Sequence, residues 1–279
     1  MIWDSPLVLC ARQELLLALR SRWTQVFAAV FAVLSLAVAA SGYVLSGGSG
    51  MQDFARTTAS LVQLVLLLVP LTSLLIGVLS LAPDRGAAEL LYAQPVGRGT
   101  VLLGKLLGLF LALAAAQAVG FGAAGAVIAS QAGEEGRGGF LLLVAGSFVL
   151  TAVFLGLAAL LGAGAVGRRR TRALALALVV WFLAIVLLDL AALGVASLLP
   201  SGPASRVLVL AVILNPADAV RTGTLLGIEG TAAFGAASLA FLRFTRGPVG
   251  AALWLCGSLL LWIVAPPVLA AMRLRRMDL

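Results

Sequence analysis

Long apolar runs separated by short polar stretches fill the chain from one end to the other. A helix that crosses the hydrocarbon core of a bilayer needs about 20 consecutive apolar residues. Six segments reach that length, and the pattern predicts an all-α, polytopic membrane protein with one transmembrane domain over residues 1–279. The predicted spans are Trp23–Leu45, Thr57–Leu81, Val101–Ser130, Phe140–Val166, Ala173–Leu199 and Val249–Met272.

Two further segments are apolar but do not have the length of a span. Residues 4–20 predict a helix along the inner membrane surface, capped by Ser5 and started by Pro6; the alternative is an extension of the first span.

Residues 200–248 contain apolar runs of only nine to eleven residues between turn and capping residues. We expect short re-entrant or interfacial helices there, forming an outer cap, with a seventh and eighth span as the alternative.

The distribution of positive charge predicts the orientation. With the N-terminus inside, inner segments hold 13 of the 19 Lys and Arg residues, and four of the remaining six lie in one long outer loop. Since short loops set the topology, both termini are predicted to be cytoplasmic.

The composition argues against a metal site or an enzyme in this chain. Hydrophobic residues make up 62% of it, histidine is absent, and the two cysteines, Cys10 and Cys256, lie far apart in the sequence. Histidine is the commonest metal ligand and general base, and soft metals are held by clustered thiols or thioethers. We therefore expect no cofactor or metal bound by this chain, and no catalytic residue.

The stretch Gly99–Lys105 matches the first seven positions of a nucleotide-binding loop, G-x-x-x-x-G-K. A working loop follows a strand and has Ser or Thr after the lysine, to hold magnesium. Here Leu106 takes that place and no strand precedes it. The match is a coincidence, and Lys105 is expected to anchor its helix at the inner lipid headgroups.

Asp189 is the one carboxylate inside a predicted span. It predicts either a proton or ion site or a structural hydrogen bond between helices. The pairs Gly122/Ala126 and Ala158/Gly162 allow close helix contacts, in folding or in dimerisation.

The inner loop between the second and third spans carries a short predicted helix, residues 83–94, with an apolar edge of Leu90, Leu91 and Tyr92. Such an edge suits a groove on a soluble partner, or packing on the protein's own bundle. The run from Gly86 to Lys105, with Glu89–Leu91, Pro95–Val96, Arg98 and Leu102–Lys105, resembles the inner-loop signature of ABC-2 type permeases. The resemblance implies a coupling helix that touches a separate ATPase, on which ATP and Mg are bound. The residues it assigns to ATPase coupling are Asp84, Arg85, Glu89, Leu90, Leu91, Tyr92 and Arg98.

Two other stretches, Trp181–Leu190 and Asn215–Gly230, resemble the permeases of transporters that mature the copper–sulfur centre of nitrous-oxide reductase. This resemblance implies a homodimer in a bacterial inner membrane, with an ABC ATPase, a periplasmic β-helical assembly protein and, indirectly, a copper-chaperone lipoprotein as partners, besides the lipid bilayer; nucleic acid is not among them. The residues expected to dock the outer partner are Asn215, Pro216, Asp218, Arg221 and Glu229.

The chain departs from that family at Ala82–Pro83 and Gly86–Ala87, where acidic residues and a Gly-Thr pair are usual. The coupling role survives these changes, but the set of ATPase-contacting residues stays open. The sequence thus favours an ATP-driven permease acting in copper-centre maturation. The alternatives are a general ABC-2 exporter of lipid or drug, and a secondary transporter driven by an ion gradient through Asp189.

Overall fold

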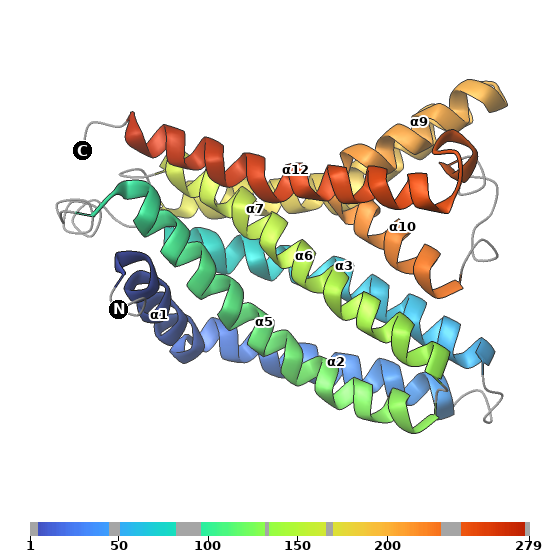
Figure 1. Cartoon of the computed structure of the whole chain (residues 1–279), viewed down its shortest axis with the longest axis horizontal. Helices are drawn as coiled ribbons and strands as arrows, with labels where there is room; N and C mark the ends of the chain where they lie inside the picture. Colours follow the sequence, from blue (N-terminus) through green and yellow to red (C-terminus); the bar gives the residue numbers. More distant parts are fainter. Residues whose placement is uncertain are drawn as a thin grey trace.

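The structure, a computed structural model, describes residues 5–44, 51–81, 96–131, 134–165, 170–229 and 241–276. Every regular element in these ranges is helical, which confirms the predicted fold class (Figure 1). The elements are α1 (Pro6–Arg20), α2 (Arg22–Val44), α3 (Met51–Leu81), α5 (Arg98–Gln131), α6 (Glu134–Ala165), α7 (Arg170–Phe182), the π-helical turn η1 (Leu183–Leu187), α8 (Leu188–Ser197), α9 (Ser201–Leu214), α10 (Pro216–Glu229) and α12 (Pro248–Arg275).

Six helical segments are long and apolar enough to cross a membrane, as predicted. The fifth is continuous through α7, η1 and α8. Both termini lie at one end of the bundle, together with the ends of α3 and α5 that flank residues 82–95 (Figure 1). The six spans are Arg22–Ser41, Thr57–Leu81, Arg98–Ile128, Gly138–Ala163, Thr171–Ser197 and Pro248–Arg275.

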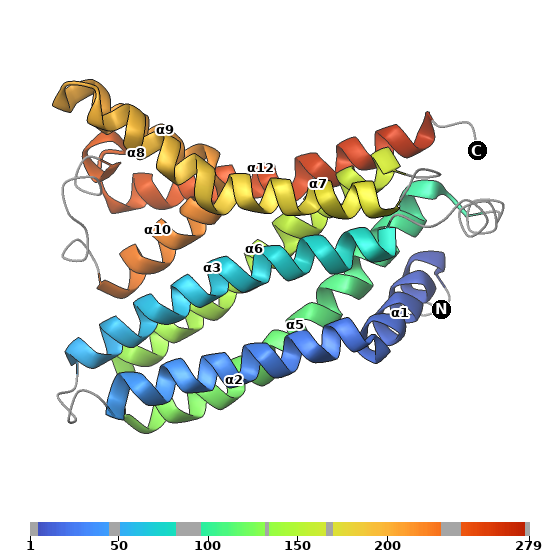
Figure 2. The ribbon, with the colours of Figure 1, turned by 180° about the vertical axis from the view of Figure 1, so that it is seen from behind.

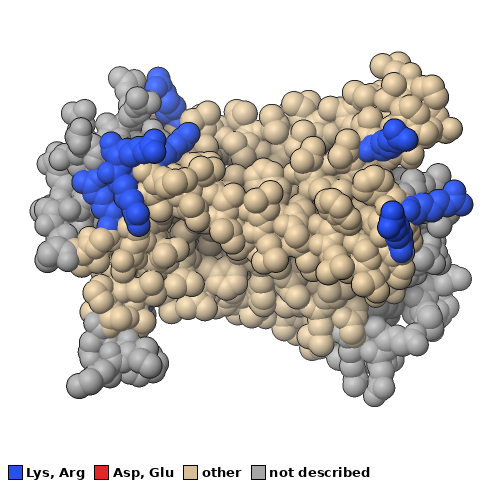
Figure 3. Space-filling model, turned by 45° about the horizontal axis from the view of Figure 1, so that its top comes forward, with Lys and Arg blue, Asp and Glu red and all other residues tan. Residues whose placement is uncertain are grey.

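The outer surface of the bundle has the character expected of a lipid-facing protein. On the face in Figure 3, Lys and Arg gather at the two ends, and the band between them carries no charged side chain. Only 17% of the most apolar window of the fifth and of the sixth span is buried within the chain. Their remaining apolar surface needs lipid or another subunit against it, so the chain is a multi-pass membrane protein.

α1 is a helix of its own and not an extension of the first span. The Ser5 hydroxyl accepts a hydrogen bond from the Val8 amide at 3.4 Å, with Pro6 in the first turn as predicted. Ser21 adopts extended backbone (φ −66°, ψ 130°) and ends α1 before α2 begins. α1 then packs along the first turns of α5 (Figure 2). Its position at the membrane surface stays a prediction.

Glycines of α5 create the room for α1. A Cβ on Gly104 would stand 2.6 Å from the Cβ of Cys10, and one on Gly108 would stand 2.4 Å from the Ala11 carbonyl oxygen. Helices in membranes associate through such close backbone approach, because burying apolar surface gains little against lipid. The stretch Gly99–Lys105, which resembles a phosphate-binding loop in sequence, therefore forms part of the surface on which α1 packs.

The two predicted small-residue faces have different uses. A Cβ on Gly77 of α3 would meet the Cβ of Ala158 at 2.6 Å, and one on Gly162 would approach the Leu81 carbonyl at 3.0 Å. This pair packs α6 on α3 within the chain. Gly122 has no described atom within 4 Å of such a Cβ, and its face lies at the surface of the bundle.

α9 and α10 form a V whose vertex, Asn215, points into the bundle (Figure 1). The chain bends by 101° between the two helices, and both arms open toward the end opposite the termini (Figure 1). Each helix has 14 residues and so a length of about 21 Å, which is too short to cross. A pair of helices bent in this way occurs both in broken spans and in re-entrant loops, so the re-entrant hairpin stays a prediction.

The close contact at Gly108 gives a direct test of α1 docking. Gly108→Ala should lower the free energy of unfolding by about 1–3 kcal/mol, because the new methyl collides with the Ala11 backbone. The matched control, Gly122→Ala, adds the same methyl in open space and should be neutral or slightly stabilising. Thermal unfolding in detergent measures both, and equal effects would contradict the proposed packing.

Candidate functional site

One arginine lies between two carboxylates near the vertex of the V. Arg221 of α10 donates from Nη2 to Asp189 Oδ2 of α8 at 2.8 Å, and it also pairs with Asp218 one turn earlier on its own helix. Asp218 is buried, whereas about a quarter of the Asp189 side chain and a third of the Arg221 side chain are exposed. The sequence does not place these three residues together; the fold does.

Asn215 ties the vertex to the fifth span. Its side-chain amide donates to the carbonyl of Ala184 at 2.8 Å and to Asp218 Oδ2 at 3.1 Å, and its Oδ1 accepts from the Ala217 amide at 3.1 Å. The last bond caps the first turn of α10, which Pro216 starts. Asn215 is almost fully buried, so each of these bonds replaces water that it has lost.

Ala184 lies in the π-helical turn η1, where the Leu188 amide bonds to the Leu183 carbonyl five residues back. A π-turn widens the helix and shifts the following residues around its axis. Asp189 comes directly after this turn and points at Arg221. Nothing in the apolar run around Ala184 signals the widened turn, so the sequence analysis missed it.

The same vertex is held from a third side by α12. The indole of Trp262 donates to the Leu214 carbonyl at 3.2 Å, and the Ser258 hydroxyl donates to the carbonyl of Ile213. α12 is thereby joined to the end of α9, next to the bonds that join α10 to span five. Because Asp189 has a cationic partner, the geometry favours its interpretation as a helix-to-helix contact over a free ion site.

A second polar cluster, which the sequence analysis missed, lies at the end of the bundle that carries the termini. Glu14 of α1 is buried, and its Oε2 lies 3.3 Å from Lys105 Nζ of α5. Lys105 also donates to the Ser80 carbonyl at 3.2 Å, and the Ser80 hydroxyl donates to Glu14. Lys105 therefore has partners within the protein on α1 and α3, and its expected contact with lipid headgroups stays a prediction. The lone acid in the apolar face of α1 was the available signal.

Of the predicted coupling residues, the structure describes Arg98 at the start of α5. Its Nη1 donates to the Leu274 carbonyl, in the last turn of α12, at 2.7 Å. The other six lie within residues 82–95 and outside the described residues. Glu229 ends α10, and its side chain is likewise outside the description.

The two residues that bracket the inner loop are thus both anchored. Ser80 precedes the loop and is bonded to α1 and α5, while Arg98 follows the loop and is bonded to α12. Across the described residues, no group of three or more acidic or thiol side chains gathers as a metal site would require. The polar chemistry that the structure shows is that of joints between helices.

Comparison with known proteins identifies the family of this chain. A family model described as "ABC-2 family transporter protein" matches residues 9–279. The chain belongs to the ABC-2 transporter family. It is 37% identical over 273 residues to the probable ABC transporter permease protein NosY of Pseudomonas aeruginosa, covering 95% of this chain and 96% of that protein. The NosY permease of Stutzerimonas stutzeri is similar to the same extent.

Family membership makes this chain the permease component of an ABC transporter, in a family whose ATPase is a separate subunit. The resemblance found in the inner-loop residues is confirmed at the level of the family.

In the Asp189–Arg221–Asp218 cluster, we expect loss of the arginine charge to destabilise the protein more than loss of the Asp189 charge. Arg221→Gln should cost roughly 2 kcal/mol of stability, because buried Asp218 then faces Asp189 without a cation. Asp189→Asn keeps an oxygen acceptor for Arg221 and should cost less than about 1 kcal/mol. Thermal unfolding of the purified chain measures this difference.

Arg206→Gln is the matched control, since Arg206 is exposed on α9 and has no carboxylate partner among the described residues. It should leave stability unchanged. If the Asp189→Asn variant is as stable as the wild type but has lost all transport function, Asp189 is not merely a contact between helices. Such a result would favour a proton or ion site at Asp189.

Proposed function

We propose that this chain is the permease of an ATP-driven ABC-2 transporter that serves assembly of the copper–sulfur centre of nitrous-oxide reductase. Similarity to two NosY permeases along 95% of the chain supports the proposal. So does the stretch Asn215–Gly230, which carries the residues that the resemblance assigns to the outer side. In the structure this stretch begins at the vertex of the V and includes all of α10.

The mechanism rests on one observation: Ser80, just before the inner loop, and Arg98, just after it, are both hydrogen-bonded to other helices. Glu14, Ser80 and Lys105 join α1, α3 and α5, while Arg98 joins α5 to α12. A push or pull on residues 83–94 by an ATPase subunit therefore moves four helices together rather than bending one of them. ATP binding and hydrolysis on the partner would rock the bundle as a rigid body.

The opposite end of that body is the V. Its vertex is bonded to span five through Ala184 and Asp189 and to α12 through Trp262. Because α3 packs on α7 of span five and α12 is itself bonded to the vertex, the movement would reach α9 and α10 through spans five and six. We propose that the V transmits the movement to a docked periplasmic β-helical protein, which works with a copper-chaperone lipoprotein.

The residue inventory favours moving that partner over passing bare copper through the membrane. The chain has no histidine, and Cys10 lies on α1 while Cys256 lies on α12. A path for a soft metal ion needs successive thiol, thioether or imidazole ligands. A sulfur-containing solute remains compatible with the proposal.

We further propose a homodimer in the bacterial inner membrane, with both termini cytoplasmic and one ATPase on each permease. The low burial of spans five and six within the chain supports a second subunit against part of that surface. A closed two-fold assembly would present two inner loops to two ATPases and would let them close as a pair.

The first test is co-purification of the tagged chain with the ATPase encoded beside it. The variant Leu91→Asp/Tyr92→Asp charges the apolar edge of the inner loop and should lose the ATPase, at least tenfold in recovered amount. The control Leu198→Asp/Leu199→Asp makes similar changes at the far end of span five, where both side chains are exposed. It should retain the ATPase. Retention by the first variant, or loss in both, would contradict coupling through this loop.

The second test addresses the nitrous-oxide reductase. A denitrifying strain that lacks its own permease should make reductase without the copper–sulfur centre, and this chain should restore the copper content and visible absorption of the enzyme. The Leu91→Asp/Tyr92→Asp variant should not restore them. If the reductase acquires a complete copper–sulfur centre in a strain without any permease, the maturation role is contradicted. The alternative of a general exporter of lipid or drug would then be favoured.

A further inference from the structure

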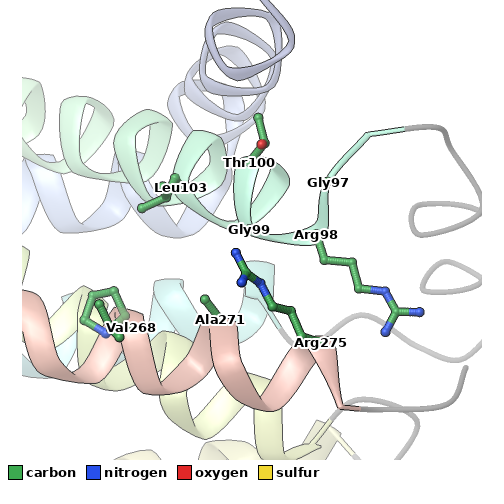
Figure 4. A pocket seen from close by; sticks show the side chains of 9 residues that line it. Gly97, Arg98, Gly99, Thr100, Leu103, Val268, Ala271 and Arg275 are labelled. Carbon is green, nitrogen blue, oxygen red and sulfur yellow. The ribbon is translucent and has the colours of Figure 1, made fainter.

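A groove of about 330 Å³ opens between the start of α5 and the end of α12, beside the root of the inner loop (Figure 4). It is independent of the vertex cluster and of the Glu14–Lys105 pair. One end of its lining is cationic and the other is apolar. Its main lining residues are Arg98, Thr100 and Leu103 from α5 and Val268, Ala271 and Arg275 from α12.

The cationic end has two guanidinium groups at the first turn of a helix. Arg275 extends from α12 across to α5, and its Nη2 lies 3.8 Å from where a Cβ on Gly99 would stand (Figure 4). Arg98 is held nearby through its bond to Leu274, the neighbour of Arg275. Arg275 pairs with no carboxylate among the described residues. Two guanidiniums and the positive end of α5 together favour a bound anion.

The apolar end continues along the membrane-spanning parts of the same two helices. Leu103 and Val268 line the groove, and each is 48% exposed. Leu107 lies one helical turn from Leu103 on the same face of α5, and Val264 lies one turn from Val268 on the same face of α12. Both side chains are also exposed. α5 and α12 diverge from this end, with α6 between them (Figure 1). The arginines lie at the boundary of both spans, since the spans are Arg98–Ile128 and Pro248–Arg275.

We propose that this groove binds one anionic phospholipid from the leaflet on the side of the termini. The phosphate would pair with Arg275 at the first turn of α5, Arg98 would add its positive charge from the rim of the groove, and an acyl chain would follow the seam between Leu103 and Val268. Charge complementarity selects the anionic headgroup, and the apolar seam within the membrane selects a lipid over a free anion. A lipid held there would join α5 to α12 next to Arg98, at one root of the inner loop.

Native mass spectrometry of the purified full chain, titrated with phosphatidylglycerol or phosphatidylcholine, tests the proposal. Wild type should bind one phosphatidylglycerol at least tenfold more tightly than phosphatidylcholine. Arg275→Gln should weaken phosphatidylglycerol binding about tenfold, the effect of one lost charge-assisted contact. The matched control, Arg273→Gln, removes the same charge from the same helix turn but does not line the groove, and it should bind as wild type does.

A second pair of variants separates the groove from surface charge. Leu103→Trp fills the apolar end without changing any charge and should also abolish the preference, whereas Val119→Trp, exposed elsewhere on α5, should not. Equal losses in Arg275→Gln and Arg273→Gln would overturn the proposal in favour of general charge attraction. Displacement of the lipid by an equal concentration of inorganic phosphate would overturn it in favour of a free-anion site.

Discussion

The lack of water in a bilayer governs how this chain is held together. A polar group within the hydrocarbon region cannot turn to solvent, so its partner has to come from the protein. Among the described residues, several polar groups find that partner on another helix, whereas others, such as the hydroxyls of Ser35 and Ser73, are buried without a hydrogen bond. Arg221 satisfies two carboxylates at once, Asn215 donates to a backbone carbonyl of span five, and Glu14 is paired with Lys105. Each junction is polar because the surrounding apolar contacts discriminate little between one helix and another.

Close packing supplies the rest of the specificity. Lipid tails are as apolar as leucine, so helices associate where their backbones can approach, and glycine permits this approach. Gly104 and Gly108 admit α1, and Gly77 with Ala158 joins α3 to α6. Glycine contacts and polar joints occur together where α3 ends and α5 begins, so α1, α3 and α5 are joined at the base of the inner loop. The proposed mechanism relies on these joints to carry force from an ATPase into the bundle.

The V at the opposite end follows from the same constraint. Neither helix of 14 residues is long enough to cross the membrane by itself, and α9 is apolar over most of its length. Their vertex is therefore pinned inside the bundle by Asn215, Arg221 and Trp262, and their arms open outward. The widened turn at Leu183–Leu187 brings Asp189 to this point. Single π-helical turns inside α-helices are frequent at functional sites, and this one lies at the junction of span five with the V.

The sequence by itself determined the all-α class, the six spans and the family, because apolar run length and the inner-loop motif are local properties. It also excluded a nucleotide site at Gly99–Lys105, since a missing hydroxyl and a missing strand can be seen in the letters alone. Only the tertiary structure decided the partners of Asp189 and Lys105. Those partners, Arg221 and Glu14, lie 32 and 91 residues away along the chain, and no helical period relates such positions. The break at Ser21, the π-turn and the separate uses of the two small-residue faces were likewise decided by packing. Apolar sequence permits many helix pairings, and the few polar and glycine contacts that select one of them can be recognised only once the helices are side by side.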